Sequence, residues 1–146
     1  PELETEFGQM IKAKVSNNPR LSHRVCFPGM LTGEAKWGAF YGSEAFILPS
    51  HQENFGIAVA EALACGVPVL ISDQVNIWTE IKAGNAGLIE NDNYEGVLNL
   101  FRNWLQLEHT QKTAMRSNAK MVYESNFAVE PAAAKFLKGI SIEPAS

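Results

Sequence analysis

The chain has 146 residues, of which 46% are hydrophobic and 19% charged, a balance typical of one soluble globular domain built round one core. Its net charge of −4 argues against a basic surface for nucleic acid or for anionic membrane lipids. The sequence contains no apolar run of the roughly 18 residues that a membrane-spanning helix needs.

Hydrophobic periodicity divides the first part of the chain into helix, strand and helix. Leu3, Phe7 and Ile11 recur at helical spacing, and an Asn-Pro pair ends that run. The predicted elements are a helix over residues 2–15, a strand over 24–27 and a helix over 32–41.

The rest of the chain continues the alternation, with strands that are apolar at nearly every position. The predicted strands are 45–48, 67–71 and 86–90, and the predicted helices are 56–65, 76–82, 94–107, 110–124 and 131–138. Strands of this kind are typical of a parallel sheet that helices cover on both faces. We therefore predict an α/β fold, with a Rossmann-like parallel sheet, flanking helices and a helical C-terminal tail.

The two cysteines, Cys26 and Cys65, each lie in an apolar run, where cysteine behaves as a small hydrophobic residue. We expect both thiols to be buried and reduced, and the protein to be cytoplasmic.

The loop over residues 49–55 follows an apolar strand, at the edge where open α/β sheets bind their ligands. The helix after this loop carries Glu61 as its one charged residue, and a carboxylate in such apolar surroundings needs hydrogen-bond donors. Glu53 precedes Glu61 by a helical rise of about 12 Å, comparable to the span from ribose to hexose in a nucleotide sugar. Between them, the amides of Phe55, Gly56 and Ile57 suit a phosphate.

Each of these residues also has a simpler structural interpretation. Glu53 could be an acid at a helix start, favoured by the helix dipole, and Glu61 a structural acid paired with a backbone donor. His51 could donate a proton or touch a sugar, although an exposed loop residue is the favoured interpretation. Trp78 could stack on a base or pack on its own short helix.

One ordered combination runs through the segment: Pro49 and Ser50, Glu53, Phe55 and Gly56, Glu61 and Ala62, Gly66, Pro68 and Val69. It closely resembles the signature of glycosyltransferase family 4, which has the GT-B fold, and the two glutamates match that family's E-x7-E motif. The resemblance extends over nearly the whole chain. It implies that residues 1–146 are part of the C-terminal domain that binds the nucleotide sugar in a retaining glycosyltransferase.

For the site, the resemblance implies that Glu53 is the catalytic residue and contacts hexose hydroxyls, and that Glu61 accepts from the ribose. The implied donor-binding residues are Ser50, Glu53, Asn54, Phe55, Gly56, Ile57 and Glu61. The donor is a UDP-, GDP- or ADP-linked hexose, and neither a metal ion nor a further cofactor is implied.

Several parts of the family pattern have no match here: the first two strands of the domain, the Arg and Lys that neutralise the diphosphate, and the acceptor domain. The chain also begins at Pro1 without a methionine. We therefore expect a fragment that is inactive alone. We expect no nucleic-acid partner, an unknown acceptor, and an open question of peripheral membrane contact through the absent domain. Val75 and Asn76 stand where the family often has two glycines, so donor choice is open as well.

Two other functions remain open at this point. One is a noncatalytic module that binds a nucleotide sugar or a protein on a GT-B-type half-fold. The other is a sugar-nucleotide epimerase of the same fold, which the E-x7-E spacing favours less than a transferase.

Overall fold

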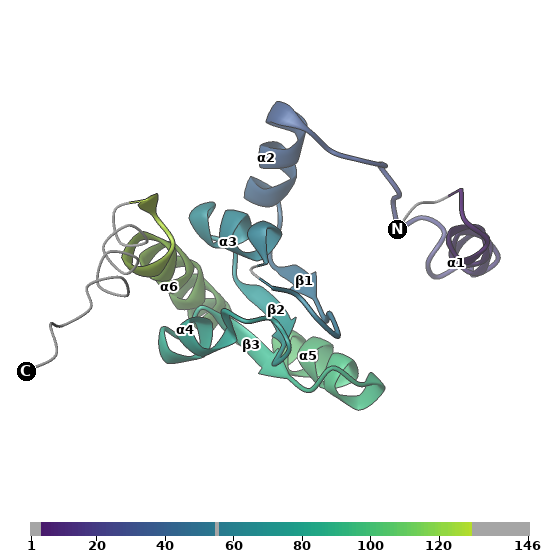
Figure 1. Cartoon of the computed structure of the whole chain (residues 1–146). Helices are drawn as coiled ribbons and strands as arrows, with labels where there is room; N and C mark the ends of the chain where they lie inside the picture. The colour runs from purple at the N-terminus through teal and green to yellow at the C-terminus, as the bar shows by residue number, and fades with distance from the viewer. Residues whose placement is uncertain (1–3, 55, 130–146) are drawn as a thin grey trace, which may run out of the picture. The chain divides into compact units, whose positions relative to one another are not determined.

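The structure is a computed structural model that describes residues 4–54 and 56–129 (Figure 1). Contacts divide the chain into two compact units, Pro1–Lys36 and Trp37–Ser146, with the boundary inside helix α2 (Gly33–Tyr41). That residues 1–146 all belong to one partial domain stays a prediction. Within the described ranges, no helix is both long and apolar enough to cross a membrane.

The amino-terminal unit contains helix α1 (Glu6–Ser16), which confirms the helix predicted over 2–15. Thr5 caps it, because its hydroxyl oxygen accepts a hydrogen bond from the Gly8 amide at 3.1 Å. The cap explains why the regular helix begins at Glu6, later than the apolar pattern alone indicates.

The strand predicted over residues 24–27 is wrong. Arg24 lies in a turn, and the Val25 amide donates to the Leu21 carbonyl oxygen at 3.0 Å, a local bond instead of a ladder. A strand needs a neighbouring strand to satisfy its backbone, and residues 4–36 contain none. The expectation of two buried thiols fails at the same place, because Cys26 is exposed while Cys65 is buried. Both cysteines are free.

The second unit is built round a three-stranded parallel sheet, as predicted (Figure 1). Its strands are β1 (Phe46–Leu48), β2 (Val69–Ser72) and β3 (Gly87–Glu90), in the order β1-β2-β3. Phe46 pairs with Val69, which pairs in turn with Gly87. The central strand is buried at every position, which explains its wholly apolar sequence up to Ser72.

The helices of this unit are α3 (Ile57–Ala64), α4 (Trp78–Ala83), α5 (Tyr94–Gln106) and α6 (His109–Asn126). They confirm the helices predicted over 56–65, 76–82, 94–107 and 110–124 to within a few residues. The helix predicted over 131–138 lies outside the described residues.

Helices cover both faces of the sheet (Figure 1). Val69 and Ile71 belong to one buried cluster with residues of α3, α4 and α6, whereas Leu70 belongs to a second cluster with Leu100 and Trp104 of α5. Successive residues of a strand point to opposite faces, so α3 and α4 pack on one face and α5 on the other. Helix α6 contributes to both clusters. This packing fixes the edge of the sheet from which the predicted donor loop emerges.

Candidate donor-binding site

The predicted donor loop connects the carboxyl end of β1 to the start of α3. The chain enters α3 through Gly56, whose φ of 66° and ψ of 52° are left-handed. A Cβ at this position would lie 3.2 Å from Cγ1 of Val75 and 3.3 Å from Cγ2 of Val59. Both the backbone angle and the lack of room therefore require glycine here. Phe55, which was predicted to supply an amide, lies outside the described residues.

Glu53 is held at this entrance through its backbone and its side chain. Its amide donates to the Gln74 carbonyl oxygen at 3.3 Å, and its own carbonyl oxygen accepts from the Asn76 amide at 3.2 Å. Its side-chain Oε1 accepts a hydrogen bond from the Gly56 amide at 3.3 Å. The carboxylate is thus placed at the amino terminus of α3.

This contact bears on both interpretations of Glu53. A carboxylate at the positive end of a helix is stabilising in itself, so the geometry suits a structural acid. The same geometry puts a partly exposed acid beside an amide that a phosphate or a sugar oxygen would use. A ligand bound to the Gly56 amide would compete with Glu53 Oε1, which would then be free to accept from a sugar hydroxyl.

Glu61 and Ile57 are one helical turn apart and lie on the same side of α3. Ile57 is 67% exposed and Glu61 is half-buried, whereas Val59, Ala62 and Leu63 on the other side are fully buried. The side of α3 that carries Glu61 therefore faces away from the core. Asn54, in the loop before the helix, is exposed as well.

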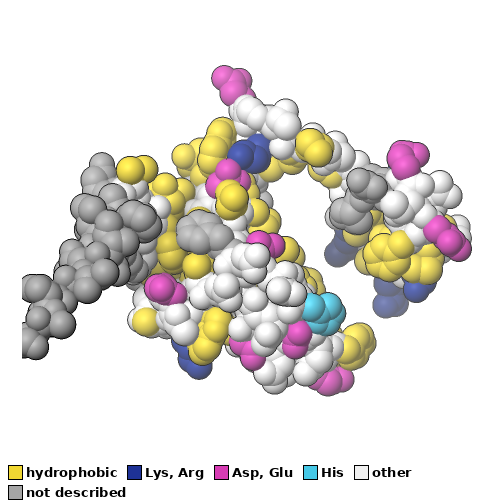
Figure 2. All heavy atoms as spheres, viewed as in Figure 1, with side chains coloured by type: hydrophobic (Ala, Val, Ile, Leu, Met, Phe, Trp, Pro, Cys, Tyr) yellow, Lys and Arg dark blue, Asp and Glu magenta, His cyan; other side chains and the backbone are white. Residues whose placement is uncertain are grey.

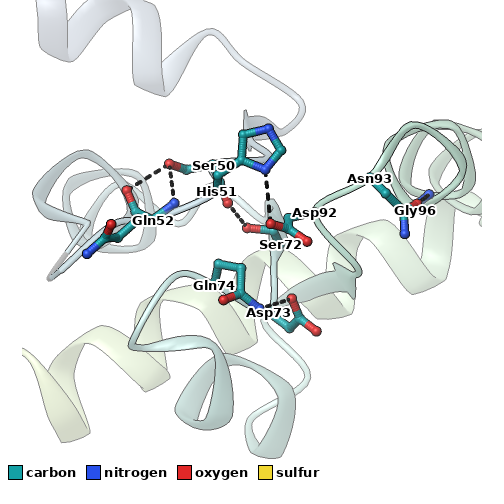
Figure 3. A network of polar contacts seen from close by, with 9 residues as sticks. All are labelled: Ser50, His51, Gln52, Ser72, Asp73, Gln74, Asp92, Asn93 and Gly96. Atoms are coloured by element: carbon teal, nitrogen blue, oxygen red, sulfur yellow. Dashed lines mark hydrogen bonds and ion pairs between the residues drawn. The ribbon is translucent and has the colours of Figure 1, made fainter.

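Polar side chains from the ends of all three strands meet beside this loop (Figure 3). Ser50 Oγ donates to the Gln52 carbonyl oxygen at 3.0 Å, and the buried hydroxyl of Ser72 donates to the Ser50 carbonyl oxygen. His51 Nδ1 lies 3.0 Å from Oδ2 of Asp92. The His51 side chain is 85% exposed, which agrees with a loop residue and leaves the rest of its ring open to solvent.

The structure thus groups Ser50, Glu53 and Gly56 in one loop at the entrance to α3, and it places Ile57 and Glu61 along the exposed side of that helix. Sequence reasoning missed Ser72 and Asp92, and it named Val75 only for donor choice; all three support the loop from β2 or from the segments that follow β2 and β3. A weak signal existed, since each of the three follows or ends an apolar strand.

The charges around the loop are mostly acidic. On the face of the sheet-containing unit that Figure 2 shows, Asp and Glu side chains are spread over the surface, and Lys and Arg do not gather into one patch. Within residues 4–54 and 56–129, no three His, Cys, Asp or Glu side chains are grouped so that they could hold a metal ion. The described loop contains no Lys or Arg, so the donors that it offers to an anion are its backbone amides and its polar side chains.

Comparisons with known proteins agree with this architecture. The family model for glycosyl transferases group 1 matches residues 12–122. The chain is 35% identical over 63 residues to a processive diacylglycerol alpha-glucosyltransferase of Acholeplasma laidlawii, covering 43% of this chain and 18% of that protein. It is 33% identical over 55 residues to a D-inositol 3-phosphate glycosyltransferase of Thermomonospora curvata, covering 38% of this chain and 12% of that protein. These matches thus span less than a fifth of either relative's length.

Solved structures share the fold. A sucrose-phosphate synthase of Thermosynechococcus elongatus aligns with a TM-score of 0.73 at 22% identity, over 90% of this chain and 33% of that one. WaaG, a glycosyltransferase involved in lipopolysaccharide biosynthesis, aligns with a TM-score of 0.56 at 22% identity, over 68% of this chain and 27% of that one. The predicted parallel α/β fold of the GT-B type is confirmed. Since the family model covers more than half of the sequence, the chain belongs to the group 1 glycosyl transferases.

Proposed function

We propose that this chain is the donor-binding part of a retaining glycosyltransferase, which transfers a hexose from a nucleotide sugar to an acceptor. One observation carries the proposal: Glu53 Oε1 accepts a hydrogen bond from the amide of Gly56, the residue just before α3, and Glu61 lies further along the exposed side of that helix. The family membership of the chain supports it.

In this proposal the two carboxylates bind opposite ends of the donor. Glu53 accepts hydrogen bonds from hexose hydroxyls, and Glu61 accepts from the ribose of a UDP-, GDP- or ADP-sugar. The diphosphate lies between them, where the amides near Gly56 and the helix dipole offset its charge. Both carboxylates keep away from the diphosphate, which they would repel.

The proposed transfer needs no group beyond donor and acceptor. The bond from the anomeric carbon to the diphosphate oxygen breaks, and the acceptor oxygen bonds to the same face of that carbon. The acceptor's proton passes to the departing diphosphate. Glu53 orients the hexose for this step, and orientation of this kind contributes much of an enzyme's rate enhancement.

The names of the relatives support a division of labour between this chain and the rest of the enzyme. One relative is named for diacylglycerol and another for inositol 3-phosphate, although both match over part of this one chain. A segment shared by enzymes with such different acceptors is suited to bind what they have in common, an activated sugar. We therefore propose that a further domain binds the acceptor, including any that lies at a membrane surface.

The test compares three alanine variants of the full-length protein. Glu53→Ala is expected to lower kcat by about a hundredfold, since it removes hydrogen bonds at the reacting sugar. Glu61→Ala is expected to raise the donor KM by about tenfold with less effect on kcat. Glu95→Ala is the matched control, because Glu95 is an exposed acid in the first turn of α5.

The outcomes separate the interpretations of Glu53. If Glu53 were only an acid at a helix start, Glu53→Ala would cost some stability and retain turnover, as Glu95→Ala should. Wild-type rates in both site variants would end the assignment. A wild-type protein that binds a nucleotide sugar without turnover would favour the noncatalytic module instead.

A further inference from the structure

The loops after β1 and β2 are joined by an isolated parallel bridge between Glu53 and Val75. Both backbone groups of Glu53 take part, through the bonds to Gln74 and Asn76 described above. Glu53 is thus held by the β2–α4 connection, although it belongs to the β1–α3 loop. A shift in the β2–α4 connection would move the Glu53 backbone with it.

Val75 anchors that connection to the core. Its side chain is fully buried and belongs to the cluster that packs under α3. Its amide donates to the Ser72 carbonyl oxygen at 3.3 Å, and its carbonyl oxygen accepts from the Trp78 amide at 2.9 Å. The residue is therefore fixed at the end of β2, at the start of α4 and in the core at once.

The Val75 side chain also lies directly against Gly56, where a Cβ would have only 3.2 Å to Val75 Cγ1. Gly56 in turn donates the hydrogen bond that holds the Glu53 carboxylate. The bridge at Val75 thus fixes the position of the Glu53 backbone. The Val75 side chain packs against Gly56, whose amide binds the Glu53 carboxylate.

We propose that Val75 is a positioning residue for Glu53, and that its buried side chain sets the place of the Glu53 carboxylate relative to the reacting sugar. The proposal rests on the donor-binding function proposed above and deepens it. A smaller side chain at position 75 leaves space under Gly56 into which the loop can relax. A displacement of about 1 Å at a reacting group can cost about a hundredfold in rate.

The chain offers a matched control in Val67. It is the same residue type, is equally buried and belongs to the same cluster, but it precedes β2 and so lies at the other end of that strand. Val67→Ala and Val75→Ala remove the same atoms from the same core. They differ in whether the cavity lies under the donor loop.

The experiment measures kcat, donor KM and Tm for the full-length wild type, Val75→Ala, Val67→Ala and Glu53→Ala. We expect both valine variants to lower Tm by similar amounts. Only Val75→Ala should lower kcat, by about tenfold at a temperature where both are folded, with a smaller change in KM. Val75→Ile keeps both γ carbons and should hold kcat closer to the wild type than Val75→Ala does.

A second variant covers the case in which Val75→Ala does not fold. Asn76 is exposed, and Asn76→Pro removes its hydrogen bond to the Glu53 carbonyl oxygen while every core side chain, Val75 included, keeps its atoms. The same fall in kcat is expected. If Val75→Ala and Val67→Ala had equal kcat values while Glu53→Ala was impaired, the positioning role of Val75 would be overturned and the proposed function would stand. If Glu53→Ala turned over at the wild-type rate, both the positioning role and the proposed function would be overturned.

Discussion

The two ends of the sheet differ in the hydrogen bonds that join neighbouring segments. At the amino end, the first residue of a strand donates a backbone hydrogen bond to the apolar residue just before the neighbouring strand. The Phe46 amide donates to the Pro68 carbonyl oxygen at 2.9 Å, and the Val69 amide donates to the Ala86 carbonyl oxygen at 3.2 Å. At the carboxyl end, polar side chains such as Ser72 join one loop to another. The first arrangement only holds the sheet together, whereas the second can exchange its hydrogen bonds with a ligand.

Charge alone does not distinguish the two ends. A cavity of about 220 Å³ beside the amino end is lined by Glu44, Lys112 and Arg116, among others. Arg116 Nη1 donates to the Ser43 carbonyl oxygen at 2.8 Å, and Lys112 Nζ lies 4.8 Å from the centre of the Trp104 ring. Because both cations already have structural partners, we do not propose this cavity for the nucleotide-sugar donor. The proposed donor site stays at the carboxyl end of the sheet.

The largest effect is expected at the amino end, from Gly87→Ala. A Cβ at Gly87 would collide with the backbone carbonyl of its ladder partner Val69, so β2 and β3 must separate there. We expect a loss of about 3 kcal/mol in the free energy of unfolding, measured by denaturant titration. The fraction that stays folded should keep its kcat. A folded variant with a lowered kcat would break the distinction between the two ends.

A smaller loss of stability, with a larger effect on activity, is expected from Gly56→Ala at the carboxyl end. The left-handed backbone costs alanine about 1–2 kcal/mol, and the contacts with Val75 and Val59 are tight. Because Gly56 holds the Glu53 carboxylate, turnover should also fall. Kinetics and thermal melting of the same sample would check both. Gly38→Ala, in α2 with open space round its Cβ, is the control: it should leave turnover unchanged and raise stability by up to about 1 kcal/mol, because alanine is the better helix former.

The smallest effect is expected from Ser72→Ala, which removes one buried hydrogen bond to the Ser50 carbonyl oxygen. The loss should be about 1 kcal/mol in stability, with a donor KM raised about twofold as the loop loosens. Ser117→Ala serves for comparison, since Ser117 is an exposed serine of α6. If the two variants gave equal donor KM values, Ser72 would only stabilise the fold.

Much of the fold could be predicted because its strongest signals are local. The runs that became β1, β2 and β3 are short, apolar and bounded by Pro or Gly, which restricts them to buried strands. Residues 24–27 carry a similar run, yet form no strand, because pairing depends on a neighbour that sequence periodicity does not reveal. The exposure of Cys26 follows from the same missing partner.

The position of the candidate site in the sequence could be predicted, but the contacts that hold its residues together could not. The loop at the carboxyl end of a strand, the glycine at the helix entrance and the spacing of Glu53 and Glu61 can all be read from one continuous segment. The bridge from Glu53 to Val75 cannot, because it joins residues from two different loops through tertiary packing. The hydrogen bond from Gly56 to Glu53 likewise depends on the left-handed turn of Gly56. The roles of the donor-binding residues stay predictions.

The most direct test of the account is donor-dependent thermal stabilisation of the full-length protein, with UDP-, GDP- and ADP-hexoses compared in wild type and Glu61→Ala. A donor at a hundred times its Kd should stabilise the wild type by about 2.7 kcal/mol, seen as a rise in Tm. We expect one nucleotide class to give this rise, and Glu61→Ala, with about tenfold weaker binding, to keep only about half of it at the same donor concentration. Equal stabilisation of both proteins by the same donor would contradict a donor site that includes Glu61, and so the account of two carboxylates on either side of the start of α3.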